Sequence, residues 1–512
     1  MTREVSALAH RFDGRTEIAR VRDLHGALEA GAESGETYRL AGRVLGRRGQ
    51  GKAAFLDLVD RSGKLQLLAS IDGMGEAAYA VVSDLKLGDV IGCEGEAIVS
   101  RRGELSLRLT ACELLAPCER SLPDLHHGLS DIEARYRQRY LDLMVNPEVR
   151  RDFEVRAKLV TGGRRYLDEC GFLEVETPVL QPLYGGAFAR PFVTRHHALD
   201  MDLYLRISNE LYLKRLLVGG LERVYEFSRD FRNEGMDRSH NPEFTMLEYY
   251  QAFADLGDML TLTEALVSRA VERARAALRF EYQGQPLDWT PPWPRLSLLD
   301  AVSAKVGEDV RALDATHLGR LTAARGIATR PGLGAGGLVD ALFNELVQPG
   351  LVQPTFVLDY PAELSPLARA SRTTPGVVER FELFAAGMEL ANAFSEQNDP
   401  EAQRRAFEDQ MALRARGDEE AQMMDHDYVR ALEYGMPPAG GVGIGVDRMT
   451  MLVCDARSIR EVILFPQLRP EEGRLEPDEE PVAAGPGTAV DAGPGGPATA
   501  APASGPTRTP AR

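Results

Sequence analysis

The chain has few cysteines and no long apolar run. Its 512 residues contain five cysteines, with no Cys-x-x-Cys pair and no histidine–cysteine cluster of zinc-binding spacing. We therefore expect reduced, mostly buried thiols, and neither a disulfide scaffold nor a structural zinc site. No stretch of ~18 apolar residues occurs, and the first residues, Met-Thr-Arg-Glu-Val, lack the apolar core of a secretory signal. These absences predict a cytoplasmic protein without a membrane partner.

Net positive charge is also missing, because the formal net charge is −17. At first this argues against a nucleic-acid partner. The charge is uneven, however: basic residues gather at 43–52 and at 101–102, whereas six acidic residues lie between positions 471 and 480. Local basic patches are enough to contact phosphates, so the composition does not exclude a nucleic acid.

Length and composition describe an ordinary globular protein. With 44% hydrophobic and 27% charged residues the chain can build sizeable cores, and its length allows about three domains. The main part alternates helices with mainly antiparallel strands, so the predicted fold class is α+β. We expect a helical N-terminal extension (1–36), a β-barrel domain (37–120), a linker helix (121–147), a main domain (148–470) with a mainly helical insertion (257–350), and a disordered tail (471–512).

The most informative segment is residues 224–250. Residues 224–232 and 243–250 predict two strands, and the loop between them is rich in turn-forming residues. Because strand side chains alternate, Phe244, Glu248 and Tyr250 share one face. If Arg232 of the partner strand faces the same way, this surface can hold a nucleotide beside a cationic small molecule. The alternative is an exposed hairpin whose charges are only solvated.

Three blocks resemble the signature motifs of the class II aminoacyl-tRNA synthetases. Residues 231–250 (Phe-Arg-Asn-Glu, a loop, and an aromatic on the return strand) resemble motif 2. Residues 441–448 (Gly-Val-Gly-Ile-Gly-Val-Asp-Arg) resemble motif 3, and residues 174–178 (Glu-Val-Glu-Thr-Pro) resemble motif 1. Within the class the chain is most similar to the bacterial type of lysyl-tRNA synthetase, over roughly residues 38–470.

The resemblance implies both a fold and a reaction. The fold is an N-terminal five-stranded OB-fold β-barrel, followed by a class II catalytic domain on a mainly antiparallel sheet with flanking helices. The reaction is the ATP-dependent activation of L-lysine to lysyl-adenylate and its transfer to the 3′ end of tRNA(Lys). Motif 1 implies a homodimer, which is also the commonest oligomer.

Two arginines are the expected catalytic residues. The hairpin places Arg232 to neutralise charge that develops at the α-phosphate, where positioning and preorganised charge suffice without a covalent intermediate. The resemblance implies that Arg448 packs over the adenine opposite Phe244 and reaches the γ-phosphate. It adds three further nucleotide-binding residues: Glu234, His240 and Asn241.

A second candidate site lies in residues 381–396. Residues 381–385 and 388–394 predict two strands joined by a turn at Gly387, which would bring Glu382 and Glu389 near one point. Paired carboxylates beside phosphates are how Mg²⁺ is normally held, so magnesium is the expected cofactor, with two or more ions bound alongside ATP. The spacing alone is equally consistent with two solvated glutamates.

The choice of amino acid follows from charge. Glu248, Tyr250 and Glu396 could converge on one spot, where two carboxylates and a phenol would suit an ammonium group and repel an acidic side chain. The resemblance completes the lysine-binding set with Gly186, Glu210 and Asn392.

Residues 37–117 predict five short strands with a helix after the third, the plan of an OB-fold that presents a strand face to single-stranded nucleic acid. Phe55, Gln66 and Arg47 could supply stacking, an amide hydrogen bond and a charged contact to unpaired bases. The spacing alone favours a plainer alternative, with Phe55 in the barrel core and Gln66 solvated. The resemblance instead assigns these three residues and Glu104 to anticodon binding.

Two other functions are compatible with parts of the sequence. A lysyl-transferring paralogue could modify a protein or a lipid, although such paralogues typically lack the barrel domain. A catalytically inactive nucleic-acid-binding regulator could share the fold, although intact Arg232, Glu389 and Arg448 argue against it. The expected partners are therefore ATP, L-lysine and tRNA(Lys).

Overall fold

The structure is a computed structural model that describes residues 9–49, 51–123, 128–330, 332–415 and 421–470. The predicted disordered tail (471–512) lies outside the described residues, as do the first eight residues of the predicted N-terminal extension. No helix within the described ranges is long and apolar enough to cross a bilayer.

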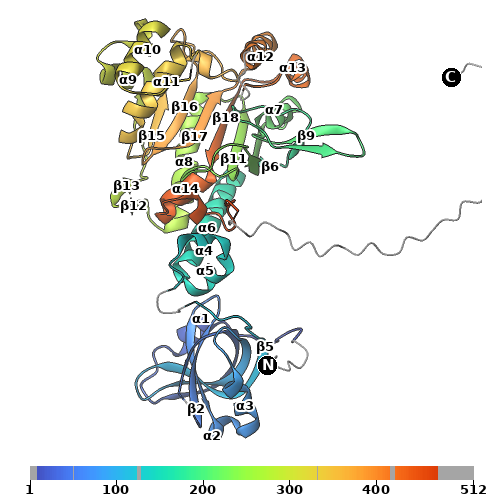
Figure 1. The fold of residues 1–512 in the computed structure, drawn as a ribbon, viewed down its shortest axis with the longest axis vertical. Helices are drawn as coiled ribbons and strands as arrows, with labels where there is room; N and C mark the ends of the chain where they lie inside the picture. Colours follow the sequence, from blue (N-terminus) through green and yellow to red (C-terminus); the bar gives the residue numbers. More distant parts are fainter. Residues whose placement is uncertain (1–8, 50, 124–127, 331, 416–420, 471–512) are drawn as a thin grey trace, which may run out of the picture. The chain divides into compact units, whose positions relative to one another are not determined.

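The N-terminal part folds into a closed five-stranded barrel in the order β1-β2-β3-β5-β4, as predicted. Figure 1 shows this barrel in blue, with α3 after the third strand. Its elements are α1 (Ile18–His25), β1 (Glu33–Arg48), β2 (Ala53–Val59), β3 (Lys64–Ser70), α2 (Ile71–Met74), α3 (Glu76–Asp84), β4 (Val90–Val99) and β5 (Leu105–Ala116).

Strand alternation explains the barrel core. On β2 the side chains of Ala54, Leu56 and Leu58 are buried inside, whereas Phe55 between them points outward and is 37% exposed. The prediction of a helical extension over residues 1–36 was wrong for most of its described part. Only Ile18–His25 is helical there, and β1 already begins at Glu33, because that residue pairs with Ile98 of β4 across a β-bulge.

The expected single linker helix is in fact two helices, α4 (Ile132–Arg137) and α5 (Arg139–Val145). Gln138 between them has φ −112° and ψ 53°, outside the helical region. The break lets the buried guanidinium of Arg139 pair with Asp142 and donate to the carbonyl of Leu464 at 3.0 Å. A buried arginine needs such partners, so tertiary contacts override the local helix propensity.

The catalytic part is built on an eight-stranded, mainly antiparallel sheet in the order β14-β15-β16-β17-β18-β11-β10-β6, so the α+β fold is confirmed. Only the pairs at the two edges, β14–β15 and β10–β6, are parallel. The strands are β6 (Leu173–Glu174), β10 (Arg223–Phe231), β11 (Glu243–Ala252), β14 (Arg295–Ser297), β15 (Thr355–Leu358), β16 (Arg380–Ala385), β17 (Met388–Ser395) and β18 (Ala439–Gly445).

Three helices cover one face of this sheet: α6 (Pro147–Glu169), α8 (Leu256–Arg275) and α14 (Val446–Cys454). Met259 and Val271 of α8 are fully buried in the main core together with Tyr249 and Phe381 of the strands. This packing leaves the other face of the central strands available for a ligand.

The segment 257–350 is not the simple helical insertion that was expected, because α8 belongs to the core of the sheet. Within the segment expected to be mainly helical, the structure has the helices α9 (Leu298–Val306) and α11 (Ala335–Leu346). The prediction missed α10 (Ala315–Ala324), edge strand β14 and a hairpin of β12 (Arg279–Tyr282) and β13 (Gln285–Asp288).

The remaining elements surround the ligand-facing side or the edges of the sheet. They are β7 (Leu180–Gln181), β8 (Val193–His196), β9 (Met201–Leu205), α7 (Glu210–Val218), α12 (Pro400–Ala415), α13 (His426–Glu433) and short 3₁₀ turns at Val310–Ala312, Gln348–Gly350, Ala362–Leu364 and Ile459–Glu461.

Candidate active site

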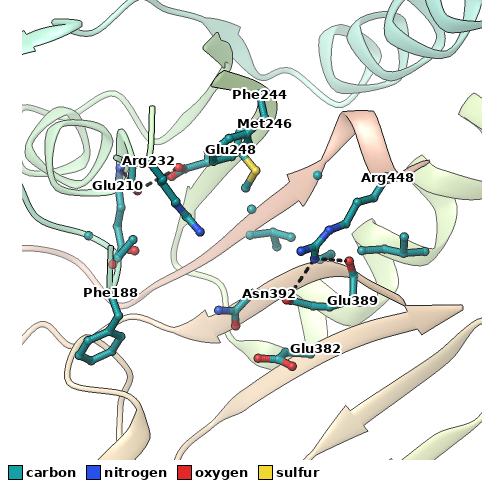
Figure 2. Close-up of a pocket in the computed structure, with 18 of the residues that line it drawn as sticks. Phe188, Glu210, Arg232, Phe244, Met246, Glu248, Glu382, Glu389, Asn392 and Arg448 are labelled. Atoms are coloured by element: carbon teal, nitrogen blue, oxygen red, sulfur yellow. Dashed lines mark hydrogen bonds and ion pairs between the residues drawn. The ribbon is translucent and has the colours of Figure 1, made fainter. Parts of the chain in front are cut away.

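A cavity of about 480 Å³ lies over the central strands of the large sheet. Its wall combines residues of β11, β16, β17 and β18 with the loop of residues 232–242 and the start of α14. In Figure 2 the side chains of Arg232 and Arg448 reach in from opposite sides, and Glu382 and Glu389 extend from the strands below. The cavity therefore brings together groups that are far apart in the sequence.

The register of the hairpin brings the two faces together, which the sequence had left open. Ser228 pairs with Met246 and Asp230 with Phe244, so these residues share one face. Arg232 follows directly after β10, with its backbone N–H donating to the carbonyl of Pro242 at 2.8 Å. Its guanidinium lies 5.1 Å from the centre of the Phe244 ring, and its buried Nε has no hydrogen-bond partner. This donor is available to an anionic ligand.

The loop between the two strands supplies three more polar side chains to the cavity, those of Glu234, His240 and Asn241. Asn241 is buried, and its Nδ2 donates to the carbonyl of Glu243 at 2.6 Å while its Oδ1 has no partner. His240 is held through Nδ1, which lies 2.8 Å from a carboxylate oxygen of Asp237. That contact directs Nε2 of the ring toward Arg448, at 3.0 Å.

Arg448 lies in the first turn of α14. Its Nη1 donates to the backbone carbonyl of Glu389 at 2.8 Å and lies 3.3 Å from Oε2 of the same residue. The preceding residue, Asp447, holds α14 against the hairpin: its carboxylate accepts from the backbone N–H of Thr245 at 2.6 Å and pairs with Arg156 at 2.6 Å. Arg448 is thus fixed across the cavity from the hairpin.

Glu382 and Glu389 lie on neighbouring strands, as predicted, and both line the cavity. The connecting turn is tight because Ala386 and Gly387 have φ of 51° and 74°. Glu382 accepts from the hydroxyl of Tyr360 at 2.8 Å and pairs with Arg380. Burial raises the pKa of Glu382 to about 7; Arg380 opposes this rise and the carboxylate of Glu389 adds to it.

This carboxylate pair fits a divalent cation that is shared with phosphates. The nearby carboxylate of Glu389 disfavours the charged form of Glu382, and a cation bound beside both would reverse that effect. No group of three or more potential ligands occurs among the described residues, so a resident all-protein metal cage is not indicated there. One or two carboxylates completed by phosphate oxygens is the usual arrangement for Mg²⁺.

Glu248 and Tyr250 form a buried acidic corner at the other end of the cavity. One oxygen of Glu248 accepts from the Tyr250 hydroxyl at 2.9 Å, and the other accepts from the Ser208 hydroxyl at 3.0 Å. Burial, together with the carboxylates of Asp230 and Glu210, raises the pKa of Glu248 to about 8. Whether Glu248 holds a proton near neutral pH therefore depends on the charge of the ligand group that binds beside it.

Glu396 lies beside this corner but is not part of the cavity wall. The sequence did not reveal that Glu396 lies behind the wall. Its Oε2 pairs with the buried ammonium of Lys214, and the same ammonium lies 2.5 Å from Glu210. Among the described residues neither Oε1 nor Oε2 has a hydrogen-bond partner, so the ion pair with Lys214 is the contact of Oε2, and Oε1 has none. Gly441, which lines the cavity, permits this arrangement, because a methyl group there would overlap both Oε1 and the Tyr250 ring.

Gly186 and Asn392 also line the cavity. Gly186 has φ +86°, and a Cβ there would lie 2.9 Å from the Ser208 hydroxyl, so the backbone can approach the ligand space only as glycine. The side-chain oxygen of Asn392 accepts from Nε of Arg380 at 3.0 Å, which turns its amide nitrogen toward other partners.

Sequence reasoning missed four residues of this region: Ser208, Lys214, Arg380 and Gln422. Lys214 follows Glu210 by four residues on helix α7 and so shares its face, which the spacing alone could have indicated. Gln422 gave no signal, since it lies outside the helices and strands and reaches the backbone of Gly186 from far along the chain.

In the barrel, Phe55, Gln66 and Glu104 lie together on the outer surface of β2, β3 and the start of β5. Gln66 donates to the Ser106 hydroxyl at 2.8 Å, and that hydroxyl donates to the carbonyl of Glu104 at 3.1 Å. The alternative that places Phe55 in the barrel core is wrong, since its ring is 37% exposed.

Arg47 does not lie on this surface. It pairs with the inward-facing Leu56, and its guanidinium donates to the carbonyls of Ser83 and Leu85. A β-bulge between Val44 and Gly46 shifts the alternation of β1 by one residue, so Arg48 takes the position opposite Phe55. Arg48 also donates to the Gln66 side chain at 3.2 Å.

Comparisons with known proteins agree with this architecture. Residues 131–469 match the family described as tRNA synthetases class II (D, K and N), and residues 38–115 match the OB-fold nucleic acid binding domain. A lysine–tRNA ligase of Moorella thermoacetica is 53% identical over 439 residues, which cover 86% of this chain and 90% of the relative. The lysine–tRNA ligases of Carboxydothermus hydrogenoformans and Thermosynechococcus vestitus are 51% and 49% identical, over 85% and 91% of this chain and 90% and 94% of their own lengths.

Proposed function

Because the chain belongs to the class II tRNA synthetases of the D, K and N group, we propose that it is a cytoplasmic lysine–tRNA ligase. The observation that carries this proposal is the chemistry at the two ends of one cavity. One end holds Arg232 over Phe244, and the other holds buried carboxylates around Tyr250. The first suits a nucleotide and the second suits the ammonium group of a lysine side chain.

In the proposed first step the α-carboxylate of lysine attacks the α-phosphorus of ATP and pyrophosphate leaves. Arg232 neutralises charge at the α-phosphate, and its unpartnered Nε is the donor that supports this role. Phe244 stacks on the adenine, with Arg448 on the opposite side and reaching the γ-phosphate. Glu234, His240 and Asn241 complete the nucleotide site from the loop.

Glu382 and Glu389 are the proposed magnesium ligands, for two or more ions that arrive with ATP. The ions supply charge neutralisation between phosphate oxygens. Arg448 contacts Glu389 in the structure, so its guanidinium exchanges this carboxylate for phosphate when the nucleotide enters. Glu382 is held ready by Tyr360 and Arg380.

Lysine is proposed to bind with its α-amino group at Glu210 and the backbone of Gly186, assisted by Asn392, and with its side-chain ammonium at Glu248, Tyr250 and Glu396. The partnerless Oε1 of Glu396, next to the Tyr250 ring, supports the second assignment. A buried carboxylate oxygen without a partner is costly, and an ammonium donor satisfies it.

The second proposed step transfers lysine to the 3′ end of tRNA(Lys). Phe55, Gln66 and Glu104 form one exposed surface for unpaired anticodon bases, with Arg47 supplying charge from the neighbouring side of the barrel. The presence of the barrel makes a protein- or lipid-modifying paralogue a weaker proposal. The polar groups that line the cavity make a catalytically inactive regulator a weaker proposal too.

ATP–pyrophosphate exchange with each of the twenty amino acids tests the proposed function. Lysine alone should drive exchange, and chelation of divalent cations should abolish it, because Glu382 and Glu389 cannot neutralise phosphate charge. Exchange driven by aspartate or asparagine in place of lysine would overturn the assignment.

The Michaelis constant for lysine should depend on pH through Glu248. Because the pKa of this carboxyl is raised to about 8, it holds a proton below that pH, and a bound ammonium group must displace the proton. Affinity for lysine should therefore rise by up to about tenfold per pH unit from about pH 6 and level off near pH 8. Glu248→Gln should remove this dependence; a profile identical to that of the wild type would contradict the role of Glu248.

Phe55→Ala should separate the two steps. Base stacking on an aromatic ring is worth ~1–3 kcal/mol, so aminoacylation of tRNA(Lys) should weaken roughly five- to a hundredfold while lysine-dependent exchange stays normal. Leu24→Ala, which removes another exposed apolar side chain, on α1, serves as the matched control and should change neither assay. An equal loss in both assays with a lowered melting temperature would mean that Phe55 is only structural.

We propose that two copies of the chain form a symmetric dimer through the segment around residues 174–178. Strand β6 is at an edge of the large sheet, and Leu173, Val179 and Leu180 beside it are 40–52% exposed. Apolar side chains next to an unpaired strand edge are suited to a second copy. Light scattering at micromolar concentration should give twice the chain mass, and a monomer would refute this.

A further inference from the structure

One buried cation of the amino-acid pocket has no place in the scheme above. Lys214 lies on α7, one turn after Glu210, and its side chain is fully buried. Its ammonium is 2.5 Å from Glu210, pairs with Glu396 and lies 5.2 Å from the centre of the Phe394 ring. It does not line the cavity, so it is not itself a ligand-binding group.

We propose that Lys214 is a positioning residue that determines the charge of the amino-acid pocket. Its ammonium joins Glu210, at the α-amino end, to Glu396, at the side-chain end. The negative charge that remains is neutralised only by an amino acid with two ammonium groups. This inference rests on the proposed function. Under this proposal Lys214 affects the binding of lysine and does not affect the binding of ATP.

The charge count supports the proposal. Glu210, Glu248 and Glu396 supply three negative charges in their ionised forms, and Lys214 supplies one positive charge. The two ammonium groups of lysine bring this sum to zero, and its α-carboxylate is counted separately, at the nucleotide end. An amino acid with a neutral side chain leaves one buried charge uncompensated. Uncompensated buried charge is strongly disfavoured.

The neighbouring charges leave this sum unchanged only when Arg232 is counted with them, because Arg206 and Arg232 together offset Glu226 and Asp230, and Arg380 offsets Glu382. Arg206 pairs with Glu226 at 2.6 Å and with Asp230 at 3.3 Å, and Arg380 pairs with Glu382. Burial alone would lower the pKa of Lys214, but Glu210 and Glu396 together raise it above the usual value for a lysine. Lys214 therefore stays charged.

The bonding of Glu396 distinguishes a positioning role from a purely structural ion pair. Lys214 pairs with Glu396 through Oε2, and within the described residues no group donates a well-formed hydrogen bond to either carboxylate oxygen. Oε1 remains without a partner beside Gly441 and Tyr250, which both line the cavity. Lys214 thus fixes one oxygen of Glu396 and leaves the other for the substrate ammonium.

A double-mutant cycle in the full-length protein tests the proposal, with lysine-dependent ATP–pyrophosphate exchange as the readout. Lys214→Met keeps the length of the side chain and removes its charge, and should raise the KM for lysine by about tenfold or more without changing the KM for ATP. Lys305→Met, which removes an exposed lysine charge on α9, is the control and should leave both constants unchanged.

The double variant Lys214→Met/Glu396→Gln removes one charge of each sign, so the pocket again needs two ammonium groups. The rise in KM for lysine in the double variant should be no greater than the rise in the more impaired single variant, because the two side chains act as a unit. A rise equal to the product of the two single rises, about a hundredfold or more, would overturn the proposal. So would an unchanged KM for lysine in folded Lys214→Met, or an equal rise in the KM for ATP.

The double variant also covers the case in which Lys214→Met does not fold. Replacing both members of a buried pair is tolerated better than breaking the pair. A KM for lysine in the double variant within about threefold of that of Glu396→Gln supports the proposal, and a further tenfold loss refutes it. Wild-type exchange with lysine tests the proposed function separately: if it is absent the function fails, and if it is present only the role of Lys214 is at issue.

Discussion

Arg232→Ala should lower the rate of lysine-dependent ATP–pyrophosphate exchange by about 10²–10³-fold, the loss expected when one preorganised donor to a developing charge is removed (~2.7–4 kcal/mol). The effect should appear in kcat, because the interaction strengthens as charge builds up at the α-phosphate. The protein should stay folded. In the described part of the chain the Arg232 guanidinium forms no ion pair within 4 Å, and its Nε has no partner to lose.

Two further variants make this result specific. Arg229→Ala removes an arginine from β10, the strand that Arg232 follows, and its ion pair with Glu243 is on the surface, so exchange and stability should change little. Arg232→Lys keeps the positive charge but loses the planar fork, so it should restore only part of the activity. Exchange in Arg232→Ala within about threefold of the wild type would refute the catalytic role of this residue.

The sequence predicted the geometry of the hairpin and of the paired glutamates because both depend on local rules. Alternation fixes which side chains of β11 share a face, and the register of β10 follows from the loop between them. Glu382 and Glu389 come together because Ala386 and Gly387 form a tight turn. These short-range features need no knowledge of the rest of the chain.

Features that depend on distant contacts were not predictable in this way. A bulge in β1 moved Arg47 off the face of Phe55 and put Arg48 there, and nothing in the local composition marks that bulge. The break at Gln138 follows from partners of Arg139 more than 320 residues away. The pairing of Lys214 with Glu396 likewise joins α7 to the end of β17 across the core.

The fold also separates what holds the site together from what binds a ligand. Tyr360 and Arg380 hold Glu382, Asp447 holds the start of α14, and Ser208 holds Glu248. Within the described residues, Nε of Arg232, Oδ1 of Asn241 and Oε1 of Glu396 are among the buried polar atoms that have no hydrogen-bond partner. Buried polar atoms without partners are uncommon, and these three line or adjoin one cavity.

Glu396→Gln is the strongest test of amino-acid choice. The carboxylate is 1% exposed, and its amide replacement removes a buried negative charge beside Tyr250 while keeping the size of the side chain. Truncating one partner of a buried charged hydrogen bond costs ~2–5 kcal/mol, so kcat/KM for lysine should fall at least tenfold and by as much as several thousandfold. The KM for ATP should not change, because Arg232 and Phe244 lie at the other end of the cavity.

The matched control is Glu433→Gln on α13. It makes the same substitution in an exposed ion pair, with Arg404 at 2.8 Å, and surface pairs contribute ~0–1 kcal/mol, so lysine kinetics should be unchanged. Exchange at saturating ATP and varied lysine measures both variants. If Glu396→Gln retains the lysine kinetics of the wild type, the ammonium site is elsewhere, and Glu248 with Tyr250 must select lysine alone. A loss confined to lysine places the selecting charge at the carboxylate of Glu396, which Lys214 holds through Oε2.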